Sequence, residues 1–335
     1  MFIEIKKIIR KLFPDNKNWE RVKNYVRPTL LRLNLMPNIV RDDYAFYLPI
    51  SKSFLEYINK NKEVIKKLED NLDENSKKEI EHFLKNVDYI STHKILKRNI
   101  LFTKEEIREQ IESIRDINKK EKNYKKFDYF EYYPSETFYG LNGVKWLPEK
   151  NVEKTKNGVA FDIGACYGDS AIAFYYNIGI KNIYSFEPEP NNFKKLQKNL
   201  SLIKESGIVP VMFGASNENK TVKISDDTYT SKISDTGKEI KVVTIDSFVK
   251  EKNVEKVSLI KMDIEGEEMN ALLGAVETIK KHKPVLSIAI YHKPEDFFEI
   301  KPWMEKNFPE YKYIIKKSNP FDPMVEVTLL AYTND

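Results

Sequence analysis

The stretch Val159–Ser170 reads V-A-F-D-I-G-A-C-Y-G-D-S and decides the fold. It opens on a short apolar run, which is typical of a buried parallel strand. Gly164 and Gly168 follow, and glycine lets the backbone turn tightly and lie close to a ligand. Asp169 and Ser170 can then cap a helix over 171–177. The stretch therefore predicts a strand, a glycine turn and a helix, the first half of a nucleotide-binding βαβ unit.

The spacing of this turn narrows the choice of ligand. A dinucleotide fingerprint is G-x-G-x-x-G, in which glycines admit a pyrophosphate to the start of a helix. Here the pattern is Asp162-x-Gly164-x-x-x-Gly168, and an acid at the end of the strand would repel a pyrophosphate. A carboxylate suits a positively charged ligand such as S-adenosylmethionine (SAM), which carries an ammonium and a sulfonium. Taken alone, the stretch also fits an ordinary strand-to-helix turn.

A second acid follows the next expected strand. Residues 182–186 read N-I-Y-S-F and are followed by Glu187 and Pro188, so that Glu187 comes 25 residues after Asp162. An acid in this position is placed to accept hydrogen bonds from ribose hydroxyls. The alternative is a solvated loop glutamate.

Two further strands end in groups that can carry chemistry. The strand within 257–262 is followed by Asp263 and Glu265, and strand alternation points both of them, with Lys261, to one side. Ligands of open α/β sheets bind beyond the carboxyl ends of the strands, so these residues are candidates for the reaction site. His292 follows a strand at 284–290, and its ordinary pKa near 6.5 suits a general base. A capping or structural histidine is the alternative.

Several motifs together resemble the FkbM family of SAM-dependent methyltransferases. They run in the family's order from about Tyr132 to the C-terminus and leave the first 130 or so residues uncovered. The resemblance implies a class I methyltransferase fold: a Rossmann-like seven-stranded sheet with an antiparallel C-terminal hairpin. It also implies O-methylation, often of sugars or other hydroxylated natural products. The matching segments are F-D-I-G-A-C-Y-G-D-S, Y-S-F-E-P-E-P, V-V-T-I-D-S-F, I-K-M-D-I-E-G-E-E-M-N-A-L-L-G-A and P-V-L-S-I-A-I-Y-H.

The resemblance also suggests roles for particular residues. Tyr139 would pass over SAM, and Ser216, in the turn after the third strand, would border the adenine. We expect His292 to be the base, Asp263 and Glu265 to orient the acceptor, and Lys261 to stabilise developing alkoxide charge. We expect no metal ligand, although Mg²⁺ held by Asp263 and Glu265 is a variant of the mechanism. The residues expected to bind SAM are Tyr139, Asp162, Gly164, Ala165, Gly168, Asp169, Ser170, Glu187, Pro188, Ser216 and Asp263.

The length of 335 residues predicts two units, a mainly helical region over 1–130 and the methyltransferase domain over 131–335. Capping-box patterns predict helix starts at Ser76 with Glu79 and at Thr103 with Glu106. The helical region has no catalytic signature, and its His82 is expected to be an ordinary side chain. It would cover the acceptor site, mediate assembly, or both.

Charge and cysteine content limit the possible partners and the cellular compartment of the protein. Residues 1–130 hold 29 Lys and Arg against 21 Asp and Glu, so the net charge of +5 arises outside the catalytic unit. This excess could favour an anionic acceptor or a membrane surface, but we favour a solvated lysine-rich surface. An amphipathic helix expected at Phe2–Phe13 could likewise touch a membrane, or dock on its own domain or a dimer partner. One cysteine, Cys166, and no signal peptide or membrane span predict a cytoplasmic protein without a nucleic-acid partner.

Together these features predict a SAM-dependent O-methyltransferase. Its acceptor would be a hydroxyl of a sugar, a nucleotide-sugar or a surface polysaccharide precursor of the capsule type. The alternatives are a non-sugar metabolite or lipid acceptor, or a scaffold that keeps the fold without turnover. A nicotinamide oxidoreductase is disfavoured by the missing third glycine and by Asp162.

Overall fold

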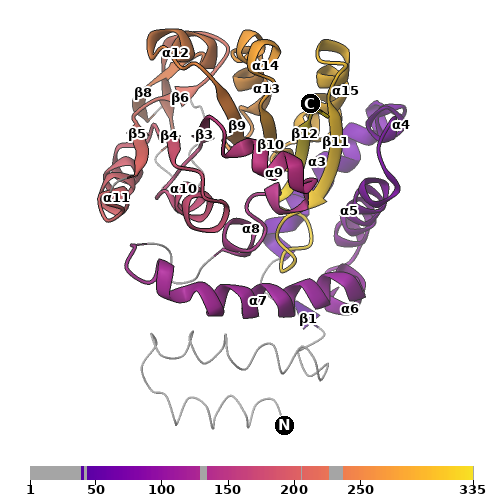
Figure 1. Ribbon diagram of the computed structural model, residues 1–335. Helices are drawn as coiled ribbons and strands as arrows, with labels where there is room; N and C mark the ends of the chain where they lie inside the picture. Colours follow the sequence, from indigo (N-terminus) through magenta and orange to yellow (C-terminus); the bar gives the residue numbers. More distant parts are fainter. Residues whose placement is uncertain (1–38, 41–43, 129–133, 205, 226–236, 335) are drawn as a thin grey trace, which may run out of the picture.

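A computed structural model describes residues 39–40, 44–128, 134–204, 206–225 and 237–334. These residues form a mixed α/β structure, with helices packed around a central sheet (Figure 1). The amphipathic helix expected at Phe2–Phe13 lies outside the described residues. Among the described helices, none has the length and apolar character needed to cross a membrane.

The central sheet has seven strands in the order β11-β12-β10-β9-β3-β4-β5. The β12 strand runs antiparallel to both of its neighbours, and the other pairs are parallel. This arrangement confirms the predicted Rossmann-like sheet with an antiparallel C-terminal hairpin. The strands are β3 (Val159–Ile163), β4 (Asn182–Phe186), β5 (Gly207–Val211), β9 (Val257–Met262), β10 (Val285–Ala289), β11 (Lys312–Lys317) and β12 (Val327–Tyr332).

The central strands are apolar because both faces of the sheet are covered. All six residues of β9 are buried, as are all five of β10. Because helices cover both faces of such a strand, its sequence is a continuous apolar run and does not alternate between apolar and polar residues. A smaller sheet consists of β6 (Gly214–Ala215), β8 (Lys238–Val243) and β7 (Lys220–Ile224), and β7 and β8 pair in it as an antiparallel hairpin.

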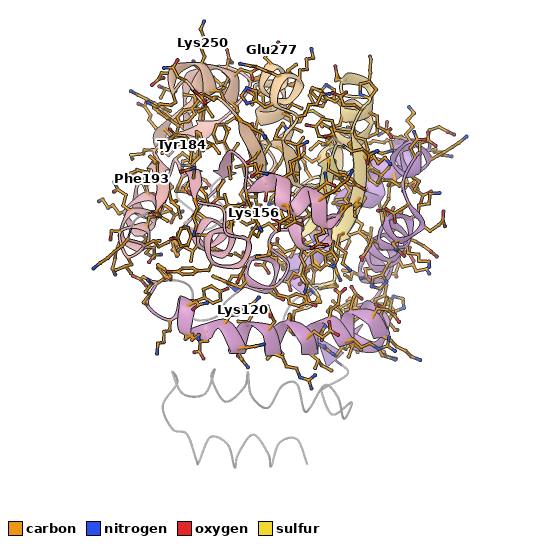
Figure 2. The ribbon with its side chains drawn as sticks, viewed as in Figure 1. Lys120, Lys156, Tyr184, Phe193, Lys250 and Glu277 are labelled. Atoms are coloured by element: carbon orange, nitrogen blue, oxygen red, sulfur yellow. The ribbon has the colours of Figure 1, made fainter. Side chains whose placement is uncertain are left out.

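Two helices depart from their predicted extents. The helix after the glycine turn begins at Asp169 and is capped by Gly168, and its last part is a π-helix, η2 (Phe174–Ile178). The residues after β9 form two helices instead of one, and they are separated where Gly274 packs against the carbonyl oxygen of Ser216. Figure 2 shows charged side chains such as Lys250 and Glu277 at the edge of the molecule. The helices here are α10 (Asp169–Ala173), α11 (Pro190–Leu200), α12 (Ile245–Glu251), α13 (Glu268–Leu273), α14 (Val276–His282) and α15 (Pro294–Asn307).

The described N-terminal helices share a core with the sheet domain. Phe54 and Phe83 pack against Phe297 of α15. Their ring centroids lie 5.5 and 4.5 Å, respectively, from that of Phe297. The α7 helix runs along one side of the molecule next to α8 (Figure 1). The division at residue 130 stays a prediction. The elements of this part are β1 (Ile39–Val40), α3 (Tyr44–Lys60), α4 (Val64–Glu69), α5 (Glu74–Thr92), β2 (Leu96–Lys97), α6 (Arg98–Leu101), α7 (Lys104–Tyr124), α8 (Ser135–Phe138), η1 (Val144–Trp146) and α9 (Glu149–Thr155).

The two predicted capping boxes have different outcomes. Thr103 caps α7, and Glu106 completes the box by accepting a hydrogen bond from the Thr103 backbone. The α5 helix instead begins after Asp73, whose carboxylate accepts the backbone N–H groups of two residues in the first turn. Ser76 then lies inside the helix, where its hydroxyl accepts the N–H of Ile315 in β11.

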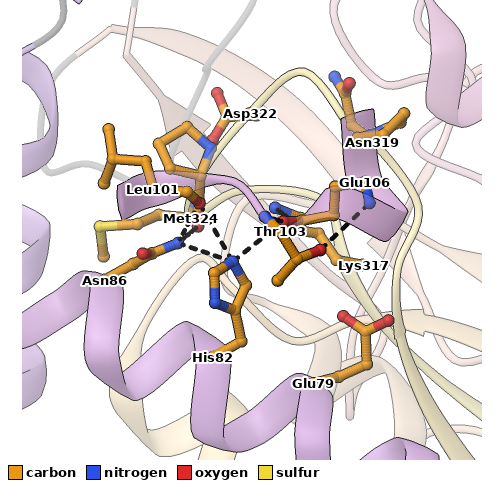
Figure 3. Close-up of polar contacts among 12 residues, drawn as sticks. Glu79, His82, Asn86, Leu101, Thr103, Glu106, Lys317, Asn319, Asp322 and Met324 are labelled. Carbon is orange, nitrogen blue, oxygen red and sulfur yellow. Dashed lines mark hydrogen bonds and ion pairs between the residues drawn. The ribbon is translucent and has the colours of Figure 1, made fainter. Parts of the chain in front are cut away.

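Glu106 has a second role, because it centres a buried ionic contact between α5, α7 and β11 (Figure 3). Its Oε2 atom lies 3.0 Å from Nε2 of His82, and its Oε1 atom contacts the ammonium of Lys317. Burial opposes the charge of this carboxyl, but His82 and Lys317 together lower the pKa of Glu106 to about 2. His82 is therefore part of the packing between helices and sheet, in keeping with the structural role expected for it.

We expect Glu106→Gln to lower the free energy of unfolding by about 3 kcal/mol, because it leaves the buried charge of Lys317 without its carboxylate. Urea unfolding followed by circular dichroism measures the change. The control is Glu105→Gln on the exposed face of the same helix turn, which should change stability by less than about 0.5 kcal/mol. Equal stability of the two variants would contradict the role of this contact.

Candidate active site

A cavity of about 280 Å³ opens at the carboxyl ends of β3, β4, β9 and β10. This is where ligands bind in open α/β sheets. Seven carboxylates and one lysine are among the described residues that line it, so its wall is strongly acidic. The lining residues are Pro134, Glu136, Thr137, Asn142, Gly164, Cys166, Asp169, Ser170, Glu187, Pro188, Glu189, Asn192, Ile224, Lys261, Asp263, Ile264, Glu265, Tyr291 and Glu326.

Gly164 allows the turn after β3 to lie directly against the end of β9. Its φ is +81°, and a Cβ at this position would overlap the carbonyl oxygen of Asp263. Backbone N–H groups of Gly164 and Ala165 both donate to the carbonyl of Phe186, at 3.1 and 2.9 Å, which fixes the turn on β4. The predicted need for glycine here therefore comes from a close backbone contact as well as from the left-handed conformation.

Glu187 is fixed in the cavity wall by the glycine turn. Its two carboxylate oxygens accept backbone N–H groups of Cys166, at 2.9 Å, and of Glu189, at 2.8 Å. Burial raises the pKa of Glu187 to about 7, despite these two hydrogen bonds. The carboxylate thus has a defined orientation and lies where the sequence predicted the ribose contact.

Asp162 lies behind the cavity wall and does not line it, so its expected contact with SAM stays a prediction. Its side chain is fully buried, and its Oδ1 atom lies 3.3 Å from the ammonium of Lys261. Lys261 also donates to the carbonyl of Gly164 at 2.8 Å. Although burial opposes its charge, Asp162 raises the pKa of Lys261, with smaller effects from Asp263 and Asp169. Lys261 is therefore a buried cation that holds the turn, although it borders the cavity.

The first turn of α10 offers the cavity a second acid. Asp169 accepts a hydrogen bond from the hydroxyl of Thr137 at 3.1 Å, and burial raises the pKa of Asp169 to about 6. Ser170 accepts one from the side-chain amide of Asn142 at 3.1 Å. These contacts attach the segment before β3 to the glycine turn, so that both border the same space.

His292 lies just behind Asp263, with carboxylates on both sides of its ring. Its Nε2 atom is 3.3 Å from Asp263 and 3.8 Å from Glu265, and its Nδ1 atom is 3.1 Å from Glu268. Burial opposes its charge, but these acids raise the pKa of His292 to about 9. The ring is therefore protonated at neutral pH in the ligand-free protein. A general base must be neutral to accept a proton, so the raised pKa disfavours this role, which stays a prediction.

The structure brings most of the predicted site residues together. Gly164, Asp169, Ser170, Glu187, Pro188, Lys261, Asp263 and Glu265 line the cavity, whereas Tyr139, Asp162, Ala165, Gly168, Ser216 and His292 do not. Tyr139 donates instead to Glu112 at 3.2 Å, and its ring packs under Lys145. Ala165 is buried within the turn, and Gly168 packs closely against Leu196.

A smaller apolar cavity of about 70 Å³ continues from the acidic one past Gly164 and Pro188. Phe213, Ala215 and Val242 are part of its lining. The turn after β5 therefore borders this space as the sequence suggested. Ser216 itself lies outside it, because its backbone N–H pairs with Val243 and its side chain is buried.

Sequence reasoning missed several acids and a tyrosine in the cavity. Glu136 comes from α8, and Glu326 precedes β12 and accepts the hydroxyl of Tyr291 at 3.0 Å. Burial raises the pKa of Glu136 to about 8 and that of Glu326 well above its usual range. The position of Tyr291 beside His292 was a usable signal. The two glutamates stand in no motif, and only the fold shows where they lie.

Backbone strain also gathers at this cavity. Of the eight described non-glycine residues with positive φ, four line it: Asn142, Cys166, Glu265 and Glu326. Such conformations cost about 1 kcal/mol or more each and persist where the surrounding structure enforces them, commonly at functional sites.

The sheet order and the position of the cavity define the class I methyltransferase fold. Residues 162–315 match the family model described as "Methyltransferase FkbM domain", which confirms the resemblance read from the motifs. The matched segment includes the glycine turn, Glu187, Asp263 and His292.

Two known proteins show how far the similarity extends. The hexuronic acid methyltransferase AglP of Haloferax volcanii is 26% identical over 133 residues, which are 38% of this chain and 54% of that protein. The crystal structure of methyltransferase FkbM from Methylobacillus flagellatus KT has a TM-score of 0.57 and 20% identity, and the match covers 84% of this chain and 61% of that one. This chain thus spans about half of the length of AglP. The similarity to the crystal structure supports the fold.

We expect Gly164→Ala to unfold the domain or abolish its ligand binding, because the new Cβ would meet backbone atoms that cannot move aside. Gly179→Ala is the matched control. It has the same kind of positive φ, but there is open space around its Cβ position, so it should cost only about 1–2 kcal/mol. Thermal unfolding of both variants measures the difference. Similar losses in the two would show that the contact between the β3 turn and β9 is not close.

Proposed function

We propose that this protein is a SAM-dependent O-methyltransferase acting on a hydroxylated acceptor of the sugar or nucleotide-sugar type. The observation that carries the proposal is the acidic cavity at the strand ends together with its apolar extension. SAM is a cation with an apolar purine at one end, and the two spaces complement these two properties. A nicotinamide dinucleotide would instead bring its pyrophosphate against the same carboxylates.

The geometry supports one orientation of SAM. The adenine would occupy the apolar extension beside Phe213 and Ala215, and the ribose hydroxyls would donate to Glu187. The ammonium of the methionine part would then pair with Asp169 at the glycine turn. This replaces Asp162, whose carboxylate is already used by Lys261.

The remaining cavity wall would receive the acceptor. In the transfer, an oxygen lone pair of the acceptor forms the new C–O bond as the bond from the methyl carbon to sulfur breaks, and S-adenosylhomocysteine leaves. The protein has to align oxygen, carbon and sulfur and to accept the hydroxyl proton. Asp263 and Glu265, which both border the cavity, would orient the hydroxyl, and Glu265 would take its proton.

A sugar acceptor is supported by the relative AglP, whose name states a hexuronic acid methyltransferase. A polyhydroxylated ring also suits a wall in which carboxylates can accept hydrogen bonds from neighbouring hydroxyls. Among the described residues, none from 44–128 lines the cavity.

Calorimetric titration with S-adenosylhomocysteine and, in parallel, with NAD tests the cofactor. We expect binding of the first in the micromolar range, about −8 kcal/mol, and none of the second. Methyl transfer from labelled SAM to a panel of nucleotide-sugars, hexuronic acids and lipid hydroxyls then tests the acceptor class. Binding of NAD alone would overturn the proposal, and transfer to lipids alone would overturn the sugar class.

The affinity for S-adenosylhomocysteine should fall as the pH is lowered through about 7, because protonation of Glu187 removes an acceptor of the ribose hydroxyls. The loss should approach tenfold for each pH unit below that pKa. Glu187→Gln, which resembles the protonated acid, should bind weakly and with a much flatter pH dependence. The control, Glu251→Gln on the exposed end of α12, should behave like the wild type. A steep pH dependence of Glu187→Gln above about pH 6, the pKa of Asp169, would exclude Glu187 as its source.

A further inference from the structure

A second cluster of polar groups lies behind the acidic cavity, where β9, α13 and the end of β10 meet. Asp263 follows β9, Glu268 begins α13, and His292 follows β10. One possible ligand atom from each of these three residues lies within 4.8 Å of the other two. A spacing of this size fits three groups bound to one metal ion, whose bonds to nitrogen and oxygen are about 2.0–2.2 Å long.

Two of the three side chains are buried, and part of the cluster has no hydrogen-bond partner. The side chain of His292 is 6% exposed and that of Glu268 is fully buried. The Oε2 atom of Glu268 accepts no hydrogen bond, and neither ring nitrogen of His292 has one of regular geometry, although carboxylate oxygens lie near both. Buried polar atoms normally have partners, so these atoms are suited to a ligand placed between them.

The charge of the cluster is also unbalanced. Asp296, which is fully buried, adds a further carboxylate whose two oxygens accept no hydrogen bond. The two lysines nearby are engaged elsewhere, since Lys261 pairs with Asp162 and Lys293 donates to the carbonyl of Gly266. Lys293 also lies 3.7 Å from Asp296, and it offsets part of the charge of that carboxylate. A bound cation would offset the charge of these buried carboxylates.

We propose that Asp263, Glu268 and His292 bind a divalent transition-metal cation. Imidazole favours zinc, iron and similar ions, whereas Mg²⁺ prefers oxygen ligands and retains its water. One imidazole with two carboxylates therefore favours Mn²⁺, Fe²⁺ or Zn²⁺ over Mg²⁺. This ligand set also differs from the Mg²⁺ variant considered from the sequence, which used Glu265 in place of the two buried residues.

Such a cation would act on the acceptor through Asp263, the one member of the set that borders the cavity. It would offset part of the negative wall and coordinate acceptor oxygens, so that an anionic sugar could approach. A metal ion also lowers the pKa of a bound hydroxyl, which would ease removal of its proton. This last step rests on the proposed methyltransferase function, whereas the metal site itself does not.

Calorimetric titration of the chelator-treated full chain with Mn²⁺ tests the site, with and without S-adenosylhomocysteine. We expect one Mn²⁺ per chain and weaker binding of Mg²⁺. Glu268→Gln and His292→Gln should each weaken Mn²⁺ binding by about tenfold or more. Glu277→Gln, an exposed acid on α14, is the matched control and should bind Mn²⁺ as the wild type does.

The outcomes separate the two proposals. Wild-type protein that binds S-adenosylhomocysteine but no Mn²⁺ would overturn the metal site and leave the methyltransferase proposal in place. Protein that binds Mn²⁺ but no S-adenosylhomocysteine would do the reverse. Because a buried substitution can unfold the protein, binding of S-adenosylhomocysteine is measured on each variant. A rise in the wild-type melting temperature with Mn²⁺ supports the site without any variant, and Mn²⁺ binding unchanged in a folded Glu268→Gln protein would contradict it.

Discussion

The ammonium of Lys261 is the interaction on which the rest of the site depends. Lys261 and Asp162 are direct neighbours in the register of β9 and β3, the two strands at the middle of the sheet. The same ammonium holds the carbonyl of Gly164, so the sheet and the glycine turn are connected through one charge. Removing either partner of a buried pair leaves an uncompensated charge at a cost of about 3–5 kcal/mol. The position of the turn, and with it the cavity wall, is therefore a consequence of this pair.

The charge of Lys261 opposes the rise in the pKa of Asp169 and of Glu187, but seven carboxylates are among the described residues that line the cavity. The wall keeps the carboxylates of Asp169, Glu187, Asp263 and Glu265 with no second lysine among its described residues. Burial then raises the pKa of several of these groups, which is the electrostatic cost of holding acids together in a site without its ligand. A cationic ligand relieves that cost on binding. The same feature that destabilises the empty site thus contributes to its affinity and its choice of ligand.

Much of the fold could be predicted because its signals are local. The apolar strand and the glycine spacing define the βαβ unit, and the capping box at Thr103 marks the start of α7 correctly. The box at Ser76 failed because Asp73, three residues earlier, is an equally good cap and the helix extends to it. The break at Gly274 could not be predicted, because it depends on a contact with Ser216, which is distant in the sequence. Local patterns set the element type, and tertiary contacts set its ends.

The roles of the acids show why the candidate site was only partly predictable. Asp162 is inside β3 and has Lys261 beside it on the next strand, so its carboxylate has a cationic partner within the sheet. Asp263 is the first residue beyond β9, where no neighbouring strand supplies a partner, and it faces the cavity. The sequence places both acids at the carboxyl end of a strand and cannot separate them by residue type. A charged partner on the neighbouring strand determines which acid stabilises the sheet and which acid faces the ligand. A single sequence does not show which strands pair, so it cannot identify that partner.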